Sequence, residues 1–237
     1  MKTYIRRREK NRELVVLYGG WGTDENLFVP LCSDKFDFIL FYDYSADEAL
    51  LLPETKTYDK IILIGWSLGV WAAQYLSAKT GIIPDLKIAV NGTSFPADDR
   101  YGIPLKVIEG TLNKMSEKTM EKYFRRMLGS RKSFQAKMER LPRRTVKSLQ
   151  DELRWLYNRI MEQTDQNFNW NYAVISENDR VFPVKSQMNY WSGHSETKSV
   201  VLPMNHYLFD NWENYVCFIR DIETWEPHAG RRKRRQL

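Results

Sequence analysis

A serine lies between two glycines where an apolar segment gives way to helix-forming residues. Ser67 is the centre of Gly65-Trp-Ser-Leu-Gly69, which fits the pattern G-x-S-x-G and follows the apolar run 60–64. A sharp turn from strand to helix leaves no room for side chains at its flanks, so glycine at both positions lifts the hydroxyl clear of the sheet. The helix start also favours negative charge that develops beside it. The pattern therefore predicts a nucleophile at Ser67, and a small residue in a tight turn is the alternative.

A serine hydroxyl needs a base to become reactive, and three histidines could supply it. His206 follows the apolar run 199–202 and precedes a helical segment, which places it in a loop at the end of a strand. His194 lies in a turn-like stretch and is interpreted as a surface residue, and His228 lies in the polar tail. We therefore predict that His206 is the base, with an ordinary loop histidine as the alternative.

The carboxylate that orients the imidazole must come from another strand end. Asp179 follows the run 170–175, and its expected role is to fix the tautomer and stabilise the imidazolium without taking the proton. Glu177 is close enough in the sequence to replace it, and a plain turn carboxylate is the other alternative. The candidate nucleophile, acid and base therefore follow the chain order Ser67, Asp179, His206.

A tetrahedral intermediate also needs two hydrogen-bond donors directed at its oxyanion. The backbone N–H of Leu68, directly after the serine, is one candidate, and the N–H of Trp21 in the loop after the first apolar run is the other. Loss of one such donor typically lowers the rate by about 10²–10³, so the shape of this loop matters as much as the three side chains. A flexible strand-end loop is the alternative interpretation of Gly19, Gly20 and Gly22.

Short apolar runs alternate with helical patterns in the first half of the chain and again near its end. Near-continuous Val, Ile and Leu runs separated by helices are typical of a parallel sheet covered on both faces. The expected strands are residues 14–18, 36–42, 60–64, 86–90, 170–175 and 199–202, and the expected helices are 67–78 and 211–220. We therefore predict an α/β fold whose core consists of residues 1–97 and 166–226.

The middle of the chain is helical and basic. Apolar residues at helical spacing predict helices over 115–128 and 145–161, and we interpret residues 98–165 as a helical insertion. Between Lys106 and Arg159 there are fifteen Lys or Arg and six Asp or Glu, a local net charge of +9 in a chain whose total is +6. The run 231–235 adds +5, so the rest of the chain carries −8.

This charge distribution indicates an acidic partner, because a basic surface attracts and orients an acidic protein through complementary potential. For any single basic residue, a solvated helix face is the alternative. The tail 227–237 is interpreted as disordered, and binding to nucleic acid or acidic lipid is its alternative. The predicted docking residues are Lys122, Arg125, Arg126, Arg131, Lys132, Arg140, Arg143 and Arg144.

Composition and spacing argue against several other classes of protein. Cys32 and Cys217 form no CxxC motif and no Cys/His cluster, so we expect reduced thiols, no metal and no cofactor. No apolar stretch approaches the length of a membrane span, and the apolar run after the polar start is too short for a signal peptide. We expect a monomeric cytoplasmic protein that binds neither membrane nor nucleic acid.

Four motifs occur along the chain in a recognisable combination: Gly20-Trp-Gly22, Gly65-Trp-Ser-Leu-Gly-Val-Trp71, Ala89-Val-Asn-Gly-Thr-Ser-Phe-Pro-Ala-Asp-Asp-Arg-Tyr-Gly-Ile-Pro104 and Asn205-His206. With them the whole layout resembles the α/β-hydrolase superfamily, and within it the BioG type of pimeloyl-[acyl-carrier protein] methyl ester esterase. This resemblance extends to about Trp225 and is most specific between Asn91 and Pro104. It implies a mostly parallel central sheet with helices on both faces and an inserted helical lid, and it carries the family's nucleophile, acid and base onto Ser67, Asp179 and His206.

The resemblance implies a serine carboxylesterase that frees the pimeloyl carboxylate in biotin biosynthesis, with acyl carrier protein as the partner that bears the substrate. Burial of five pimeloyl methylenes supplies at most about 4 kcal/mol at about 0.8 kcal/mol each, which corresponds to roughly millimolar affinity before entropic costs. Contacts with the carrier protein must therefore contribute to binding. A carrier-protein thioesterase, a general small-ester carboxylesterase and a non-catalytic interaction module are the alternatives.

Overall fold

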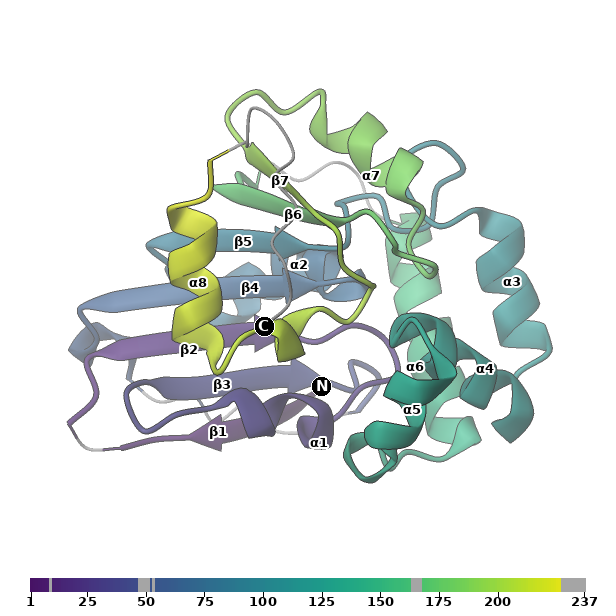
Figure 1. Ribbon diagram of the computed structural model, residues 1–237, viewed down its shortest axis with the longest axis horizontal. Coiled ribbons are helices and arrows are strands. Elements are labelled where there is room, and N and C mark those ends of the chain that lie inside the picture. Colours follow the sequence, from purple (N-terminus) through teal and green to yellow (C-terminus); the bar gives the residue numbers. More distant parts are fainter. Residues whose placement is uncertain (9, 47–51, 53, 163–167, 227–237) are drawn as a thin grey trace.

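One mostly parallel sheet forms the centre of the computed structural model, which describes residues 1–8, 10–46, 52, 54–162 and 168–226 (Figure 1). Within these residues the sheet has seven strands in the order β1-β3-β2-β4-β5-β6-β7. β1 pairs antiparallel with β3, and all the other neighbours are parallel. The strands are β1 (Lys2–Arg6), β2 (Glu13–Tyr18), β3 (Asp37–Tyr42), β4 (Lys60–Trp66), β5 (Leu86–Val90), β6 (Tyr172–Ser176) and β7 (Lys198–Leu202).

The six predicted strands are confirmed, with ends that differ by no more than two residues from the predicted ones. β1 was not predicted. It lies at the edge of the sheet, pairs only with β3, and its residues are half-buried or exposed. An edge strand of this kind needs no apolar run, so the usual signal for a buried strand was absent.

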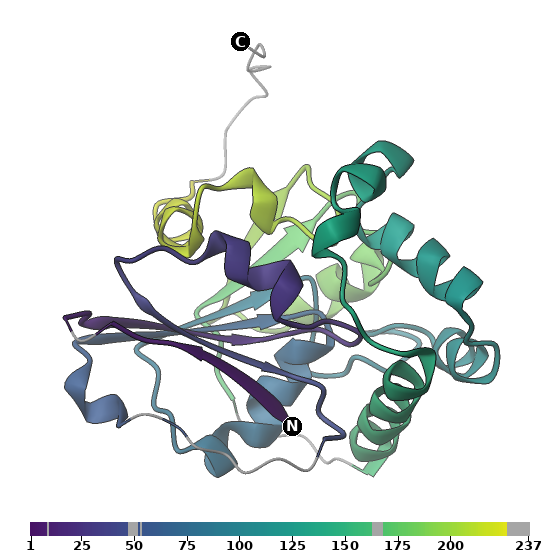
Figure 2. The same ribbon diagram turned by 90° about the horizontal axis from the view of Figure 1, so that it is seen from below.

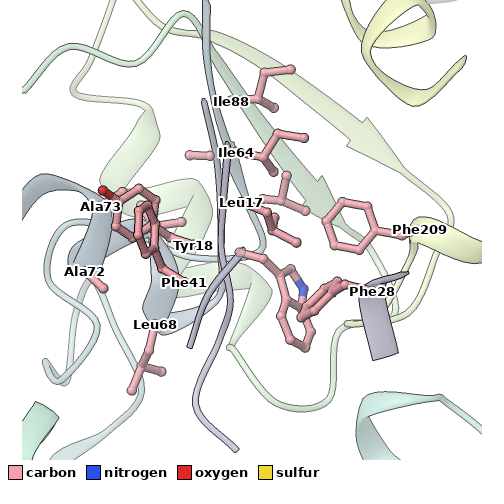
Figure 3. Close-up of a cluster of buried hydrophobic side chains, with 14 of the residues drawn as sticks. Leu17, Tyr18, Phe28, Phe41, Ile64, Leu68, Ala72, Ala73, Ile88 and Phe209 are labelled. Carbon is pink, nitrogen blue, oxygen red and sulfur yellow. The ribbon is translucent and has the colours of Figure 1, made fainter. Parts of the chain in front are cut away.

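Helices cover both faces of the sheet, as expected from the sequence. In Figure 2, α2 (Leu68–Thr80) lies on one face, whereas α1 (Glu25–Phe28) and α8 (Tyr215–Glu223) lie on the other. Successive side chains of a strand point to opposite faces, so each inner strand contributes to both halves of the core. Figure 3 shows Leu17, Ile64 and Ile88 directed towards Phe28 and Phe209, while Tyr18 and Phe41 face Ala72 and Ala73 of α2.

Four α-helices of the described residues between β5 and β6 lie beyond the carboxyl ends of the strands (Figure 1). We call residues 105–162 the lid segment. The predicted helices 115–128 and 145–161 correspond to two of these four. The other two were not predicted, because one is only six residues long and the other is a nine-residue helix that contains Gly110. The lid helices are α3 (Leu105–Asn113), α4 (Glu117–Met127), α5 (Arg131–Ala136) and α6 (Val146–Glu162).

The remaining elements are short. α7 (Val184–Trp191) was not predicted. Four 3₁₀ helices connect larger elements where the structure describes the chain: η1 (Val29–Leu31), η2 (Thr55–Thr57), η3 (Met138–Arg140) and η4 (Phe209–Asn211). The predicted boundary at residues 165 and 166, the tail 227–237 and His228 lie outside the described residues.

Neither a membrane span nor a metal cluster occurs in the part of the chain that the structure describes. No helix there is long and apolar enough to cross a bilayer. No three His, Cys, Asp or Glu side chains of that part come together as metal ligands would. Cys32 and Cys217 are both free thiols.

Candidate active site

Ser67 occupies the turn between β4 and α2 in a backbone conformation that non-glycine residues rarely adopt. Its φ is 56° and its ψ −125°, and its side chain is not used to cap the helix that it precedes. Ser116 and Ser130 behave differently, because each has extended backbone and accepts a backbone N–H of its own helix. An extended backbone and a side chain that accepts a helix N–H are the usual features of a helix-capping serine. At Ser67 the backbone is strained and the hydroxyl remains available, as a nucleophile would require.

The two glycines of the G-x-S-x-G pattern are required by close backbone approaches. A Cβ at Gly69 would overlap the carbonyl oxygen of Tyr18, at the end of β2, and a Cβ at Gly65 would lie 2.8 Å from Val70 Cα. The first turn of α2 is therefore in direct contact with the sheet, and any side chain at these positions would displace Ser67.

His206 and Asp179 form a buried hydrogen-bonded pair. His206 Nδ1 lies 2.7 Å from Asp179 Oδ2, and both side chains are fully buried. The other oxygen of Asp179 accepts the backbone N–H groups of Val181 and Phe182 at 2.8 Å each. With all of its partners donating, the carboxylate accepts the Nδ1 proton of the imidazole, which leaves the lone pair on Nε2.

His206 Nε2 is buried and has no hydrogen-bond partner among the described residues. The ring packs on the indole of Trp66, the residue before Ser67, with 4.9 Å between ring centroids. A buried nitrogen without a partner is uncommon in folded proteins and calls for an explanation. For a nitrogen that acts as the base for a serine, the missing partner would be the serine hydroxyl. Such a serine–histidine hydrogen bond often forms fully only when substrate is bound.

The backbone of His206 is held by two side chains for which the sequence indicated no such role. The His206 carbonyl accepts Trp66 Nε1 at 2.9 Å and Asn91 Nδ2 at 2.8 Å. Asn91 is fully buried and has a φ of 49°. Its side-chain oxygen also accepts the backbone N–H of Ser176, and its side-chain nitrogen donates to the Ser176 hydroxyl. An asparagine directly after a strand is a recognisable signal, because asparagine tolerates positive φ better than most residues.

The backbone N–H groups of Trp21 and Leu68 have no hydrogen-bond acceptor in the described part of the chain. The Gly20 carbonyl accepts the Thr23 hydroxyl at 2.7 Å, and the Ser67 carbonyl accepts a backbone N–H of α2. In a trans peptide the C=O and the N–H point in opposite directions. Each carbonyl contact therefore fixes the direction of the N–H in the same peptide, either that of Trp21 or that of Leu68.

The loop that carries Trp21 is tightly packed rather than loosely held. Tyr44 donates its hydroxyl to the Gly19 carbonyl at 2.6 Å. A Cβ at Gly20 would lie only 2.9 Å from Ser67 Cβ, so the loop lies directly against the serine. Burial raises the pKa of Tyr44 far above its ordinary value, and the charge of Glu152 adds to this effect, so the hydroxyl stays protonated.

The alternatives for the base and the acid are exposed residues, unlike the buried pair of Asp179 and His206. His194 is exposed, and its Nδ1 lies 2.9 Å from the carbonyl oxygen of Tyr190 in its own turn. Glu177 is exposed, and its backbone N–H donates to Leu202. Of the predicted residues, the structure brings Asp179 and His206 into direct contact, and the His206 ring packs on Trp66, the residue before Ser67.

Two of the predicted docking residues are engaged inside the protein. Arg144 has a side chain that is 6% exposed, and it pairs with Glu152 at 2.6 Å and with Asp43 at 2.8 Å. Arg140 pairs with Asp210 at 3.0 Å and is only partly exposed. Because Arg144 is buried and neutralised by carboxylates, it does not belong to the docking surface, and Arg140 contributes less than its charge suggests.

The other predicted docking residues remain accessible on the lid segment. Arg125 is half-exposed and lies 3.7 Å from Glu121 in the same helix. The residues with exposed side chains are Lys122, Arg126, Arg131, Lys132 and Arg143. We call these five residues the basic lid surface.

Sequence comparisons identify relatives of this chain. The family model described as pimeloyl-ACP methyl esterase BioG matches residues 1–218. A malonyl-[acyl-carrier protein] O-methyltransferase of Bacteroides fragilis is 40% identical over 183 residues, which cover 76% of this chain but only 36% of that protein. The chain thus spans about a third of the length of this relative. An uncharacterised protein of Haemophilus influenzae is 30% identical over 213 residues, covering 87% of this chain and 94% of that protein.

Solved structures agree with the sequence matches. The crystal structure of BioG from Haemophilus influenzae has a TM-score of 0.80 at 29% identity, covering 91% of this chain and 98% of that chain. An esterase from Exiguobacterium antarcticum has a TM-score of 0.66 at 14% identity, covering 94% and 96%, which is a likeness of fold alone. The chain therefore has an α/β-hydrolase fold and belongs to the BioG family of pimeloyl-ACP methyl esterases.

Proposed function

We propose that this chain is a serine carboxylesterase that hydrolyses the methyl ester of pimeloyl-[acyl-carrier protein]. Ser67 acts as the nucleophile, His206 as the general base and Asp179 as the carboxylate that orients the imidazole. The observation that carries this proposal is the buried, unpartnered His206 Nε2, whose ring packs on the residue before Ser67. Its other nitrogen is already held by Asp179.

The proposed reaction has two steps, acylation of the serine and its hydrolysis. Ser67 Oγ attacks the ester carbonyl while its proton passes to His206 Nε2, and the resulting oxyanion accepts the N–H groups of Trp21 and Leu68. Collapse of this intermediate breaks the bond to the methoxy oxygen, which takes the proton from His206 and leaves as methanol. A water molecule, deprotonated by His206, then attacks the acyl-serine ester. This second collapse frees the carboxylic acid and returns the proton to Ser67.

The substrate class rests on the family and on charge. The Bacteroides relative is named for methyl transfer to malonyl-[acyl-carrier protein], and so for forming a methyl ester on a carrier-bound acid. An enzyme that removes such an ester must accept the carrier protein close to its active site. The basic lid surface supports this partner, because it presents exposed positive charge on the segment beyond the carboxyl ends of the strands.

The test uses purified protein and methyl-pimeloyl carrier protein, with the product followed by mass spectrometry. We expect the loss of one CH₂ unit from the acyl group, whereas a thioesterase would release the whole acyl chain. Ser67→Ala should abolish this hydrolysis and that of a p-nitrophenyl ester. Ser77→Ala, in the same helix, should leave both unchanged. Full activity of Ser67→Ala would reject the assignment of the nucleophile.

The monomeric state and the cytoplasmic location expected from the sequence stay predictions. Size-exclusion chromatography with light scattering tests the first.

A further inference from the structure

The lid segment makes direct hydrogen bonds to the loop that carries the proposed oxyanion donor. Glu152 of α6 accepts the Gly22 N–H at 3.0 Å, and Tyr123 of α4 donates its hydroxyl to the Trp21 carbonyl at 3.4 Å. These contacts hold the peptide between Trp21 and Gly22 from both sides. The indole Nε1 of Trp21 donates to the Leu149 carbonyl of α6 at 2.8 Å. Residues from two lid helices thus surround one residue of the loop.

Glu152 is the most deeply buried of these contacts. It is 0% exposed, and its carboxylate also accepts the Tyr44 N–H at 3.3 Å and Arg144 Nη1 at 2.6 Å. Burial raises the pKa of this carboxyl, while the Arg144 guanidinium and the Gly22 N–H act in the opposite direction. The Gly22 N–H, the Tyr44 N–H and Arg144 Nη1 are all hydrogen-bond donors, so these contacts suit an ionised carboxylate. Arg144 also pairs with Asp43 at 2.8 Å.

A buried ion pair is weak evidence for stability by itself, because removing charges from water offsets their attraction. Apolar side chains could fill this space without desolvating a charge. Glu152 differs from such a filler in one respect, because its oxygen atoms fix particular backbone N–H groups. A role in local geometry therefore explains its presence better than a role in overall stability.

We infer that Glu152 is a positioning residue for the oxyanion hole, and that α6 of the lid segment is part of the catalytic framework. This inference rests on the proposed function. Glu152 fixes the peptide that follows Trp21, and Thr23 fixes the peptide that precedes it through the Gly20 carbonyl. The Trp21 N–H lies between these two anchors. A shift of either anchor moves this donor relative to the oxyanion.

Glu152→Gln tests the inference, since it preserves the shape of the side chain but replaces one acceptor with an N–H₂ group. The adjacent Asp151→Asn is the matched control, because Asp151 is a partly exposed residue of the same helix that pairs with Lys147 and Arg154. For a p-nitrophenyl ester, we expect Glu152→Gln to lower kcat by about tenfold to 10²-fold with little change in KM, because the donor is displaced rather than deleted.

A second readout separates positioning from folding. An alkylboronic acid forms a tetrahedral adduct with a reactive serine, and its Kd for Glu152→Gln should rise by the same factor as kcat falls. Tyr123→Phe removes the contact on the other side of the same peptide, and it should lower kcat by a few-fold even if Glu152→Gln does not fold.

The outcomes are distinct. Wild-type protein that neither hydrolyses esters nor binds the boronic acid would reject the proposed function. Active wild-type protein, with kcat and boronate affinity unchanged in Glu152→Gln, would overturn this inference alone. A variant with a lower unfolding temperature but unchanged kcat would assign Glu152 a structural role only. If Glu152→Gln does not fold, unchanged kcat and boronate affinity in Tyr123→Phe would overturn it.

Discussion

Gly20→Ala is the sharpest test of how closely the first loop must approach the nucleophile. The backbone of Gly20 does not have positive φ, so alanine brings no conformational strain and the effect is steric. The new Cβ would lie 2.9 Å from Ser67 Cβ and 3.0 Å from the indole of Trp66, whereas ordinary contacts are 3.4–4 Å. The loop and the serine must therefore separate by roughly half an ångström or more.

This displacement acts directly on the oxyanion donor. The Trp21 N–H belongs to the peptide that follows Gly20, so it moves away from the oxyanion together with the loop. Misplacement by about 1 Å can cost about 10²-fold in rate, and loss of one oxyanion donor costs about 10²–10³. We expect kcat to fall by about 10²-fold, which corresponds to about 2.7 kcal/mol of activation free energy, with KM nearly unchanged.

The assay is steady-state hydrolysis of a p-nitrophenyl ester, combined with denaturant unfolding. Overpacking costs about 1–3 kcal/mol of stability, so the unfolding curve must show that the variant is folded under assay conditions. Gly110→Ala is the matched control, because a Cβ there meets nothing within 4 Å in helix α3. It should leave kcat unchanged and raise stability by up to about 1 kcal/mol. A folded Gly20→Ala with kcat close to that of the wild type would refute the tight approach. Raised KM with unchanged kcat would instead indicate crowding of the substrate.

The remaining predictions concern the base and the partner. Asn91→Ala should cost about 1–3 kcal/mol of unfolding free energy for each buried group left unpaired, and should lower kcat because the His206 backbone loses one of its two anchors. Asn91→Gly should be more stable than Asn91→Ala by about 1 kcal/mol, because glycine accepts the positive φ, but it should be equally impaired in kcat; recovery of kcat by glycine would contradict the anchoring role. Charge reversal at Lys122 and Arg126 should lower kcat/KM for the carrier-bound ester by about tenfold at low salt, while a p-nitrophenyl ester is unaffected. Lys79→Glu, on α2, is the control, and an equal loss there would indicate a non-specific effect of net charge.

Much of the fold was predictable because its signals are local. The six predicted strands contain nearly continuous apolar runs, and five of them are inner strands of a sheet whose two faces are covered by helices. α4 and α6 carry apolar residues at helical spacing. β1 and α5 lack such signals, because an edge strand pairs on one side and a six-residue helix depends on its surroundings.

The candidate site was predictable to a lesser extent. The turn at Ser67 has its own pattern, and the loops that carry Asp179 and His206 follow apolar runs. The docking residues were harder to predict, because charge along the chain does not reveal which side chains are buried. Arg144 shares the basic composition of its neighbours but is enclosed by two carboxylates, Glu152 at eight residues' separation and Asp43 from a distant part of the chain.

The sequence by itself determined six of the strands, the longer helices and the residue types able to carry out acyl transfer, because periodicity and turn chemistry are encoded over a few neighbouring positions. Only the tertiary structure decided which groups meet across the molecule. Asn91 and Trp66 donate hydrogen bonds to the His206 carbonyl, and Glu152 of the lid segment accepts one from Gly22. Each of these hydrogen bonds joins residues more than a hundred positions apart in the chain. Such contacts depend on how the elements pack, and no short stretch of the chain specifies them.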